Sequence, residues 1–178
     1  MTPAQLSQIK ANIEASEGRT SWLYRDSGPA GAATCGIGHL VPDFAACQSL
    51  PFLPPITGAE WARLLSEPRG CRASFYQTVT TGRLSDAAID ALLDQDVTER
   101  LGPIRSAIPG FDALPDGPMA AVFDMAYNLG VSGLTKGYPH LMAALATRDW
   151  ETCAAQCRRI GVSVVRNTKT AEMFSSAV

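Results

Sequence analysis

The sequence predicts an α+β protein that is mostly helical, with one small sheet near the N-terminus. Apolar residues recur at a spacing of three or four along most of the chain, and capping patterns precede several of these runs, which predicts helices. Two short runs, Trp22 to Asp26 and Ala33 to Gly36, flank a turn rich in Gly and Pro (Ser27 to Gly31), which predicts a hairpin. The 178 residues, 46% of them hydrophobic, suffice for one domain or for two small lobes that share a core.

The first predicted helix carries a carboxylate on its apolar face. Leu6, Ile9 and Ile13 form a stripe at helical spacing, and Glu17 continues that stripe before Gly18 ends the helix. Burying a bare carboxylate costs several kcal/mol, so such a group must be paired, protonated or functional. Glu17 is therefore a candidate functional residue.

The middle of the chain is harder to interpret. Residues 43–55 are predicted to be a loop because prolines are frequent there. Thr57 and Glu60 form a capping box that predicts a short helix through Leu65. A further helix is predicted over residues 71–80.

Longer helices are predicted from residue 85 onward. Ser85 caps the first of them, and Gly102-Pro103 is expected to kink or break it. Gly130 is expected to end a strongly apolar helix and to open a Gly/Ser-rich loop. The remaining predicted helices are Asp116 to Leu129, Pro139 to Thr147, Asp149 to Arg159, and about Thr168 to the end.

The charge distribution excludes some classes of partner. The net charge of −2 disfavours nucleic acid binding, which requires a basic face. The imbalance is local, because residues 85–157 carry ten acidic and four basic side chains, whereas residues 158–178 carry four basic and one acidic. No apolar run approaches the ~20 residues that span a bilayer, and the N-terminus lacks the features of a signal peptide. We therefore expect no membrane insertion, and delivery to any target outside the cytoplasm by a holin, a secretion machine or a fused module.

Five cysteines and two histidines are present, without a Cys-x-x-Cys pair, which disfavours a structural zinc site. A disulfide between Cys47 and Cys71 would close the proline-rich segment, and it requires an oxidising compartment. Cys153 and Cys157, one helical turn apart, are interpreted as small apolar residues of a core. Neither a metal nor a cofactor is predicted.

Residues 17–39 contain the candidate catalytic side chains. Glu17-Gly18 is followed by Tyr-x-Asp ending at Asp26, and then by Thr34-x-Gly-Ile-Gly-His39. Two carboxylates on different short elements, brought together by a hairpin, are the minimum apparatus for hydrolysis of a glycosidic bond. Glu17, at the edge of an apolar stripe, suits the general acid, whereas Asp26, on a turn rich in backbone amides, is expected to stay ionised. The hydroxyl of Thr34 can help Asp26 to hold a water molecule.

This pattern resembles that of the phage-type lysozymes, glycoside hydrolase family 24. The resemblance extends over most of the chain, including Tyr127-Asn128-Leu129-Gly130, and residues 43–83 match poorly. It implies a single lysozyme-like domain over residues 1–178, with a small lobe at about 18–83 and a helical lobe formed by residues 1–17 and about 108–178. A connecting helix over about 86–106 is implied between them.

The implied activity is that of a muramidase, which cleaves the β-1,4 bond between N-acetylmuramic acid and N-acetylglucosamine with inversion. The roles implied for Glu17, Asp26 and Thr34 are acid, base and water-positioning residue. Bacterial peptidoglycan is then the partner, acted on by a monomer at the cell wall, as a phage endolysin, a secreted antibacterial effector or an excised domain of either.

The resemblance also implies supporting residues. Arg166 matches an arginine that pairs with the catalytic glutamate, and His39 and Asp96 match a histidine–carboxylate ion pair. The positions expected to line the saccharide groove are Leu40, Tyr127, Asn128 and Gln156.

Two other classes of function remain open at this point. Cys35 and His39, four residues apart, could form the nucleophile and base of a cysteine hydrolase, although no third orienting residue is evident and Cys35 is expected to face the core. Alternatively, the chain could be a non-catalytic wall-binding module, although the intact set of Glu17, Asp26 and Thr34 argues against it.

Overall fold

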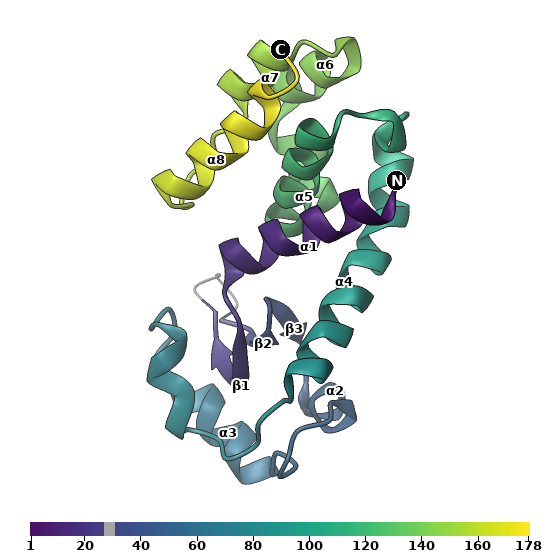
Figure 1. Cartoon of the computed structure of the whole chain (residues 1–178). Coiled ribbons are helices and arrows are strands. Elements are labelled where there is room, and N and C mark those ends of the chain that lie inside the picture. Colours follow the sequence, from purple (N-terminus) through teal and green to yellow (C-terminus); the bar gives the residue numbers. More distant parts are fainter. Residues whose placement is uncertain (27–30) are drawn as a thin grey trace. The chain divides into compact units, whose positions relative to one another are not determined.

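The computed structural model describes residues 1–26 and 31–178, and it confirms a mostly helical α+β fold with a small sheet near the N-terminus (Figure 1). Residues 27–30 of the predicted turn lie outside the described part. The helices are α1 (Pro3–Glu17), α2 (Phe44–Ser49), α3 (Gly58–Ser66), α4 (Asp86–Ala107), α5 (Asp116–Gly137), α6 (Pro139–Thr147), α7 (Trp150–Gln156) and α8 (Val164–Ser175), with 3-10 helices η1 (Ala73–Thr78) and η2 (Phe111–Ala113).

The described residues form two compact units. Residues 17–96 make up the sheet unit, and residues 1–16 with 97–178 make up the helical unit. By sequence, α1 and α4 each contribute residues to both units. The bridging role predicted for residues 86–106 concerns the relative placement of the units, and it stays a prediction.

The sheet has three antiparallel strands in the order β1 (Thr20–Arg25), β2 (Ala33–Gly36) and β3 (His39–Val41). The hairpin of β1 and β2 was predicted, but β3 was not, because three residues are too short for a pattern of alternation. Gly36 and Gly38, with φ angles of 61° and 73°, adopt the left-handed conformation that turns β2 back into β3.

The predicted loop at residues 43–55 is partly wrong, because its first half forms α2. Asp43 caps this helix, since its side chain accepts a hydrogen bond from the backbone N–H of Ala46 at 2.8 Å. The capping box at Thr57 is confirmed, with both of its reciprocal hydrogen bonds present at the start of α3. The segment predicted as helical over 71–80 contains η1, which Trp22 joins to β1 by donating from Nε1 to the carbonyl oxygen of Ala73.

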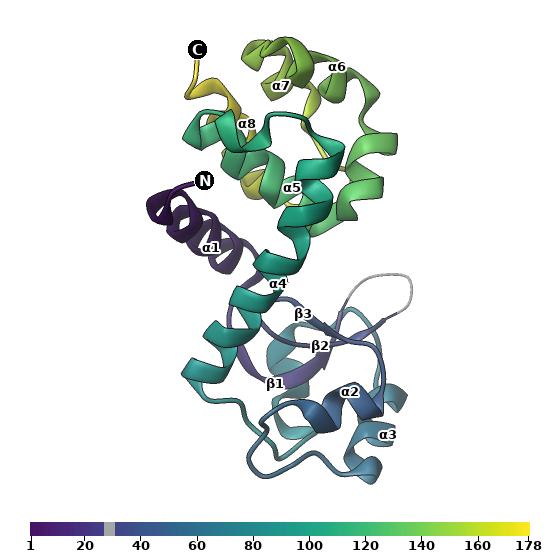
Figure 2. The same cartoon turned by 90° about the vertical axis from the view of Figure 1, so that its right-hand side faces the viewer.

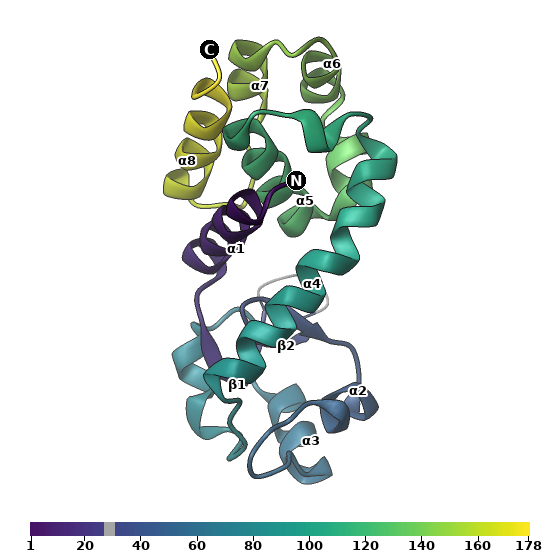
Figure 3. The same cartoon turned by 45° about the vertical axis from the view of Figure 1, so that its right-hand side comes forward.

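In the helical unit, α5 is the central element, and its first half is buried all round, as its apolar composition predicts. It packs against α8 and α6, and α7 packs against both of those helices (Figure 3). The N-terminal helix joins this unit where Asn12 donates to the sulfur atom of Met173 in α8 at 3.4 Å.

Three predicted boundaries in these helices need correction. Pro103 lies inside α4, which continues to Ala107, so the expected break at Gly102-Pro103 is wrong. Gly130 does interrupt the helical backbone, with φ 72° and ψ 157°, but residues 131–137 then resume a helix and are not the expected loop. The last helix begins at Val164 because Ser163 caps it, accepting from the N–H of Arg166.

Candidate active site

Glu17 is the last residue of α1, and Gly18, with a φ angle of 75°, ends the helix there. The half-buried Glu17 side chain lies against the backbone of Gly38. A Cβ atom built at Gly38 would come within 3.3 Å of Glu17 Cγ and within 3.5 Å of its carboxylate atom Oε2. The absence of a side chain at this position therefore makes room for Glu17 at the turn between β2 and β3.

Asp26 directly follows β1, where the hairpin closes. Its backbone N–H donates to the carbonyl oxygen of Ala32 at 3.1 Å, and its carboxylate oxygen Oδ1 accepts from the N–H of Ala32 at 3.2 Å. The preceding residue, Arg25, is buried and donates to the carbonyl oxygens of Gly31, Leu65 and Glu67 at 2.7–3.0 Å. These contacts fix the end of β1 and with it the backbone of Asp26.

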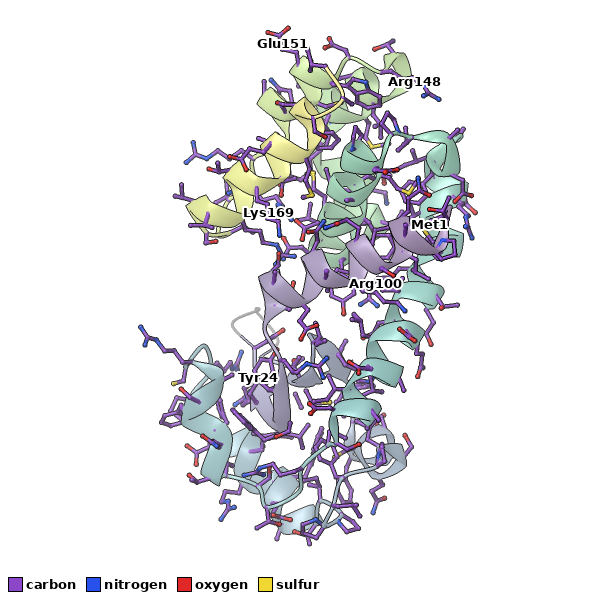
Figure 4. The ribbon with its side chains drawn as sticks, in the orientation of Figure 1. Met1, Tyr24, Arg100, Arg148, Glu151 and Lys169 are labelled. Atoms are coloured by element: carbon purple, nitrogen blue, oxygen red, sulfur yellow. The ribbon has the colours of Figure 1, made fainter. Side chains whose placement is uncertain are left out.

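The phenol of Tyr24 interacts electrostatically with the carboxylates of both Glu17 and Asp26. Burial, followed by the negative charges of Glu17, Cys35 and Asp26, raises the pKa of the Tyr24 phenol. The phenol therefore stays protonated over the working range of pH and can donate a hydrogen bond. Among residues 1–26 and 31–178, the Tyr24 hydroxyl makes no hydrogen bond to the protein. Figure 4 shows Tyr24 in the sheet unit.

Sequence reasoning quoted Tyr24 as part of a motif but gave it no role. The available signal was its position two residues before Asp26, since residues i and i+2 of a strand face the same side. The register adds to this, because Tyr24 pairs with Thr34 across the hairpin.

Thr34 is the middle member of a row that crosses the sheet. It pairs with Tyr24 of β1 on one side and with Leu40 of β3 on the other, and cross-strand partners project from the same face. Thr34 is 4% exposed and donates from its hydroxyl to the carbonyl oxygen of Ala32 at 3.3 Å, whereas Leu40 is 52% exposed. Along this row, the hydroxyl of Thr34 is buried, whereas the apolar side chain of Leu40 on β3 is exposed to solvent.

His39 and Asp96, for which the resemblance implies an ion pair, lie in direct contact. His39 Nδ1 lies 3.1 Å from Asp96 Oδ2, and the Asp96 side chain is almost completely buried in α4. The contact joins β3 to α4 within the sheet unit.

The arrangement around His39 also weighs against a cysteine hydrolase. Cys35 lies opposite His39 in the register, and Asp96, already implied as the partner of His39 by the resemblance, could supply the orienting carboxylate of such a site. Cys35, however, is 0% exposed, and burial, followed by the charges of Cys47 and Asp96, raises the pKa of its thiol to about 12. A thiol that stays protonated and out of reach of solvent is not a nucleophile.

The other cysteines are free thiols as well. Cys47 and Cys71 are not bridged, so the disulfide considered for them is not formed in this structure. Cys153 and Cys157 are buried in the helical unit, as predicted.

In the helical unit, Arg166 contacts a carboxylate that sequence analysis did not single out. Its Nη2 atom lies 2.7 Å from Oδ1 of Asp124, which is 2% exposed in α5. Arg159, itself 1% exposed, approaches the other oxygen of Asp124 at 2.8 Å and donates to the hydroxyl of Thr170 at 2.6 Å. Glu17, the partner implied for Arg166, belongs to the other unit, and that pairing stays a prediction.

The remaining predicted groove residues also belong to the helical unit. Tyr127 is 8% exposed in α5, and the guanidinium of Arg100, labelled in Figure 4, lies 4.2 Å from the centre of its ring. Asn128 and Gln156 are exposed, the former in α5 and the latter at the end of α7. A common groove that joins these residues to the sheet unit stays a prediction.

No group of three or more His, Cys, Asp or Glu side chains among the described residues is arranged to hold a metal ion. Within the same residues, every helix is too short or too polar to cross a membrane.

Comparison with known families gives a match over most of the chain. The family model described as phage lysozyme matches residues 14–169, a range that includes every residue of the candidate site. A search of curated proteins finds no match.

Proposed function

This chain belongs to the phage lysozyme family, whose members hydrolyse peptidoglycan as muramidases, and from that premise we propose the residues and the course of its reaction. Glu17 protonates the departing sugar oxygen, and Asp26 acts as the base that activates a water molecule on the opposite face of the ring. Thr34 helps Asp26 to hold that water. The bond cleaved is the β-1,4 bond between N-acetylmuramic acid and N-acetylglucosamine.

One arrangement carries this proposal: within the sheet unit, Glu17 ends α1 and packs on Gly38 between β2 and β3, while Asp26 follows β1 and closes the hairpin on Ala32. An inverting reaction needs such a pair, with a separation of about 6.5–9.5 Å that leaves room for a water molecule. The environments of the two also differ as the roles require. Glu17 packs on Gly38 at the end of an apolar stripe, while Asp26 accepts a hydrogen bond from the backbone N–H of Ala32.

Inversion follows from the assignment of Asp26 as a base and not as a nucleophile. The attacking water enters opposite the leaving group, so the β-linked sugar is released first as the α anomer. No metal or cofactor takes part in these steps. We propose that the chain acts as a monomer at the cell wall, as an endolysin or a secreted antibacterial effector domain that a holin or a secretion machine delivers.

The experiment that tests this function is a digest of purified peptidoglycan, followed by reduction and mass analysis of the soluble products. Reduced N-acetylmuramic acid at the new chain ends is the expected result, and proton NMR during the first minutes should detect the α anomer. Cut peptide stems, or N-acetylglucosamine at the reducing ends, would contradict the assignment. Wall binding without any soluble product would favour the non-catalytic module.

A further inference from the structure

A pocket apart from the proposed catalytic residues opens between α7 and α8 of the helical unit. It has a volume of about 450 Å³, within the range of ligand sites. Figure 2 shows these two helices as neighbours in that unit. None of the described residues that line this pocket is proposed for catalysis or predicted to line the saccharide groove. They are Ala154, Ala155, Cys157, Arg158, Arg159, Ile160, Gly161, Val162, Val164, Asn167, Thr168 and Ala171.

The pocket uses a different side of α8 from the buried ion pair with α5. Arg166 turns toward α5, where it contacts Asp124. Val164, Thr168 and Ala171 follow one another at spacings of four and three, which places them on one face of α8, and all three line the pocket. A ligand in the pocket therefore leaves the contact of Arg166 with Asp124 in place.

Three large apolar side chains at or beside the pocket are exposed to solvent. Ile160 and Val164, which line the pocket, are 101% and 78% exposed, and the adjacent Val165 is 79% exposed. Single exposed apolar side chains are common, but several that gather beside a pocket mark an interaction site. Folding buries none of the three, so their apolar surface is available to a partner.

The charges around the pocket favour a negatively charged partner. Arg158 lines the pocket and is exposed, and among residues 1–26 and 31–178 no carboxylate forms an ion pair with it. Lys169, labelled in Figure 4, directly follows Thr168 on α8. None of the described lining residues is acidic. An apolar centre with a charged rim is the usual anatomy of a protein interface.

Two other occupants fit these features less well. A bilayer presents no discrete side chain that could fill a concave pocket, and binding to anionic lipids relies on clusters of about four to eight basic residues. Residues 158–178 contain four, of which Arg159 and Arg166 are engaged with Asp124. A second copy of this chain would bring the same basic side chains together across a twofold interface, and like charges there are unfavourable.

We propose that the pocket between α7 and α8 docks an acidic segment of a partner protein. One apolar side chain of that segment enters the pocket and contacts Ile160 and Val164, and the neighbouring carboxylates face Arg158 and Lys169. This docking goes beyond the proposed hydrolysis and does not depend on it. It attaches the chain to a partner through residues that take no part in cleavage.

The probe is a library of random peptides displayed on phage and selected in parallel on the unchanged protein and on two variants. Thr168→Trp fills the pocket that Thr168 lines, whereas Ser175→Trp places the same side chain two turns further along α8, outside the lining. Peptides with an apolar residue beside Asp or Glu should be enriched on the unchanged protein and on Ser175→Trp, but not on Thr168→Trp.

Affinities of the most enriched peptide, synthesised with a fluorescent label, make the comparison quantitative. Thr168→Trp should lower the affinity about tenfold or more, which corresponds to about 1.4 kcal/mol. Arg158→Glu should also weaken binding, most strongly at low salt, because charges at the rim act through electrostatic attraction. Arg63→Glu, the same charge reversal at an exposed position of α3 in the sheet unit, is the matched control and should bind as the unchanged protein does.

Ile160→Asp guards against misfolding of the tryptophan variant. Ile160 is fully exposed, so the thermal midpoint should change little. Peptide binding should nevertheless be lost, because the substitution replaces an apolar contact by a negative charge that repels the acidic peptide.

Several outcomes would overturn the proposal. These are a selection that enriches no peptide above the level on Thr168→Trp, enriched peptides without acidic residues, and equal affinity in the unchanged protein and all variants. Binding to phosphatidylglycerol vesicles, or self-association, that Ile160→Asp abolishes would assign the pocket to a membrane or to a second copy instead. Displacement of the peptide by soluble peptidoglycan fragments would assign it to the substrate. Binding of an acidic peptide that Thr168→Trp and Arg158→Glu both weaken supports the docking site, even if the chain cleaves no glycan.

Discussion

The sheet unit and the helical unit use their carboxylates in different ways. In the sheet unit, Glu17 and Asp26 are half-buried at the ends of elements, and both act on the phenol of Tyr24. In the helical unit, Asp124 is 2% exposed within α5, and Arg159 and Arg166 contact its two oxygens. The buried carboxylate of Asp124, enclosed by two guanidinium groups, holds α5 to α8 and to the segment before α8, whereas a carboxylate at the end of an element can meet a substrate. Substitution of each type of carboxylate should therefore affect different properties.

The largest effect is expected for Glu17→Gln. The amide keeps the shape of the side chain but cannot deliver a proton, and general acid catalysis is typically worth about 10²–10⁴-fold in rate. The fold should stay intact or become more stable, because a carboxylate on an apolar stripe is kept for function at a cost in stability. Clearing of peptidoglycan suspensions and the thermal midpoint, measured on one preparation, give both quantities. If Glu17→Gln cleared peptidoglycan suspensions as fast as the unchanged protein, the mechanism proposed above would be contradicted.

Asp124→Asn should show the opposite pattern, with a loss of stability as the primary effect. Removing the charge leaves Arg159, which is fully buried, without its counterion, and breaking a buried ion pair in this way costs about 3–5 kcal/mol. Denaturant unfolding measures the loss. Glu151→Gln, at an exposed position in the first turn of α7, is the matched control and should change the free energy of unfolding by less than about 0.5 kcal/mol. Equal effects of the two substitutions would show that Asp124 is not enclosed.

The difference between these two kinds of carboxylate also explains which functional and structural contacts could be predicted from the sequence. Glu17, Asp26 and Thr34 are found within 18 positions of each other, on a helix end and a hairpin whose patterns are local. The contact of Asp124 with Arg159 joins residues 35 positions apart, and that with Arg166 joins residues 42 apart. Arg159 lies between α7 and α8 and Arg166 lies in α8, and no local pattern specifies how these segments are placed against α5. The pairing therefore required the structure.

Short elements were missed for a related reason. Asp43 is a good helix cap, but the prolines around it favoured a loop, and α2 is only six residues long. Without β3, the row from Tyr24 through Thr34 to Leu40 could not be predicted, although each of its members was visible in the sequence.

Gly38 and Gly18 offer a finer test within the sheet unit. Both have φ angles near 75°, so alanine at either position should cost about 1–2 kcal/mol of backbone strain. At Gly18 nothing lies within 4 Å of the new Cβ, whereas at Gly38 the Cβ meets the Glu17 side chain at 3.3 Å. Gly38→Ala should therefore lower kcat for peptidoglycan by about tenfold, since a displacement of Glu17 by a fraction of an ångström weakens proton transfer. Gly18→Ala should lose similar stability but keep more activity, and equal kcat values would refute the role of this contact.

The smallest effect concerns Glu60, a carboxylate of the sheet unit that is neither catalytic nor enclosed by arginines. Hydrogen bonds from the backbone N–H of Thr57, and from the backbone and hydroxyl of Thr81, lower the pKa of Glu60 to about 2, against a usual value of 4.5. A lowered folded pKa means that the stabilisation is fully present above about pH 4.5 and is lost as the pH falls through about 2.

Glu60→Gln should therefore lower stability by about 1 kcal/mol near pH 7, because hydrogen bonds to an ionised acceptor are replaced by weaker ones to an amide. The difference from the unchanged protein should shrink as the pH is lowered from about 4.5 toward 2, where Glu60 itself is half protonated. Thr81→Val is the matched control: it removes the hydroxyl donor but keeps the backbone donor, so it should reproduce only part of the loss. Thermal midpoints of both variants across this pH range make the measurement. A Glu60→Gln deficit of constant size from pH 7 to pH 2 would mean that the charge of Glu60 does not stabilise the junction of α3 with Thr81, and that this carboxylate is only part of a local helix cap.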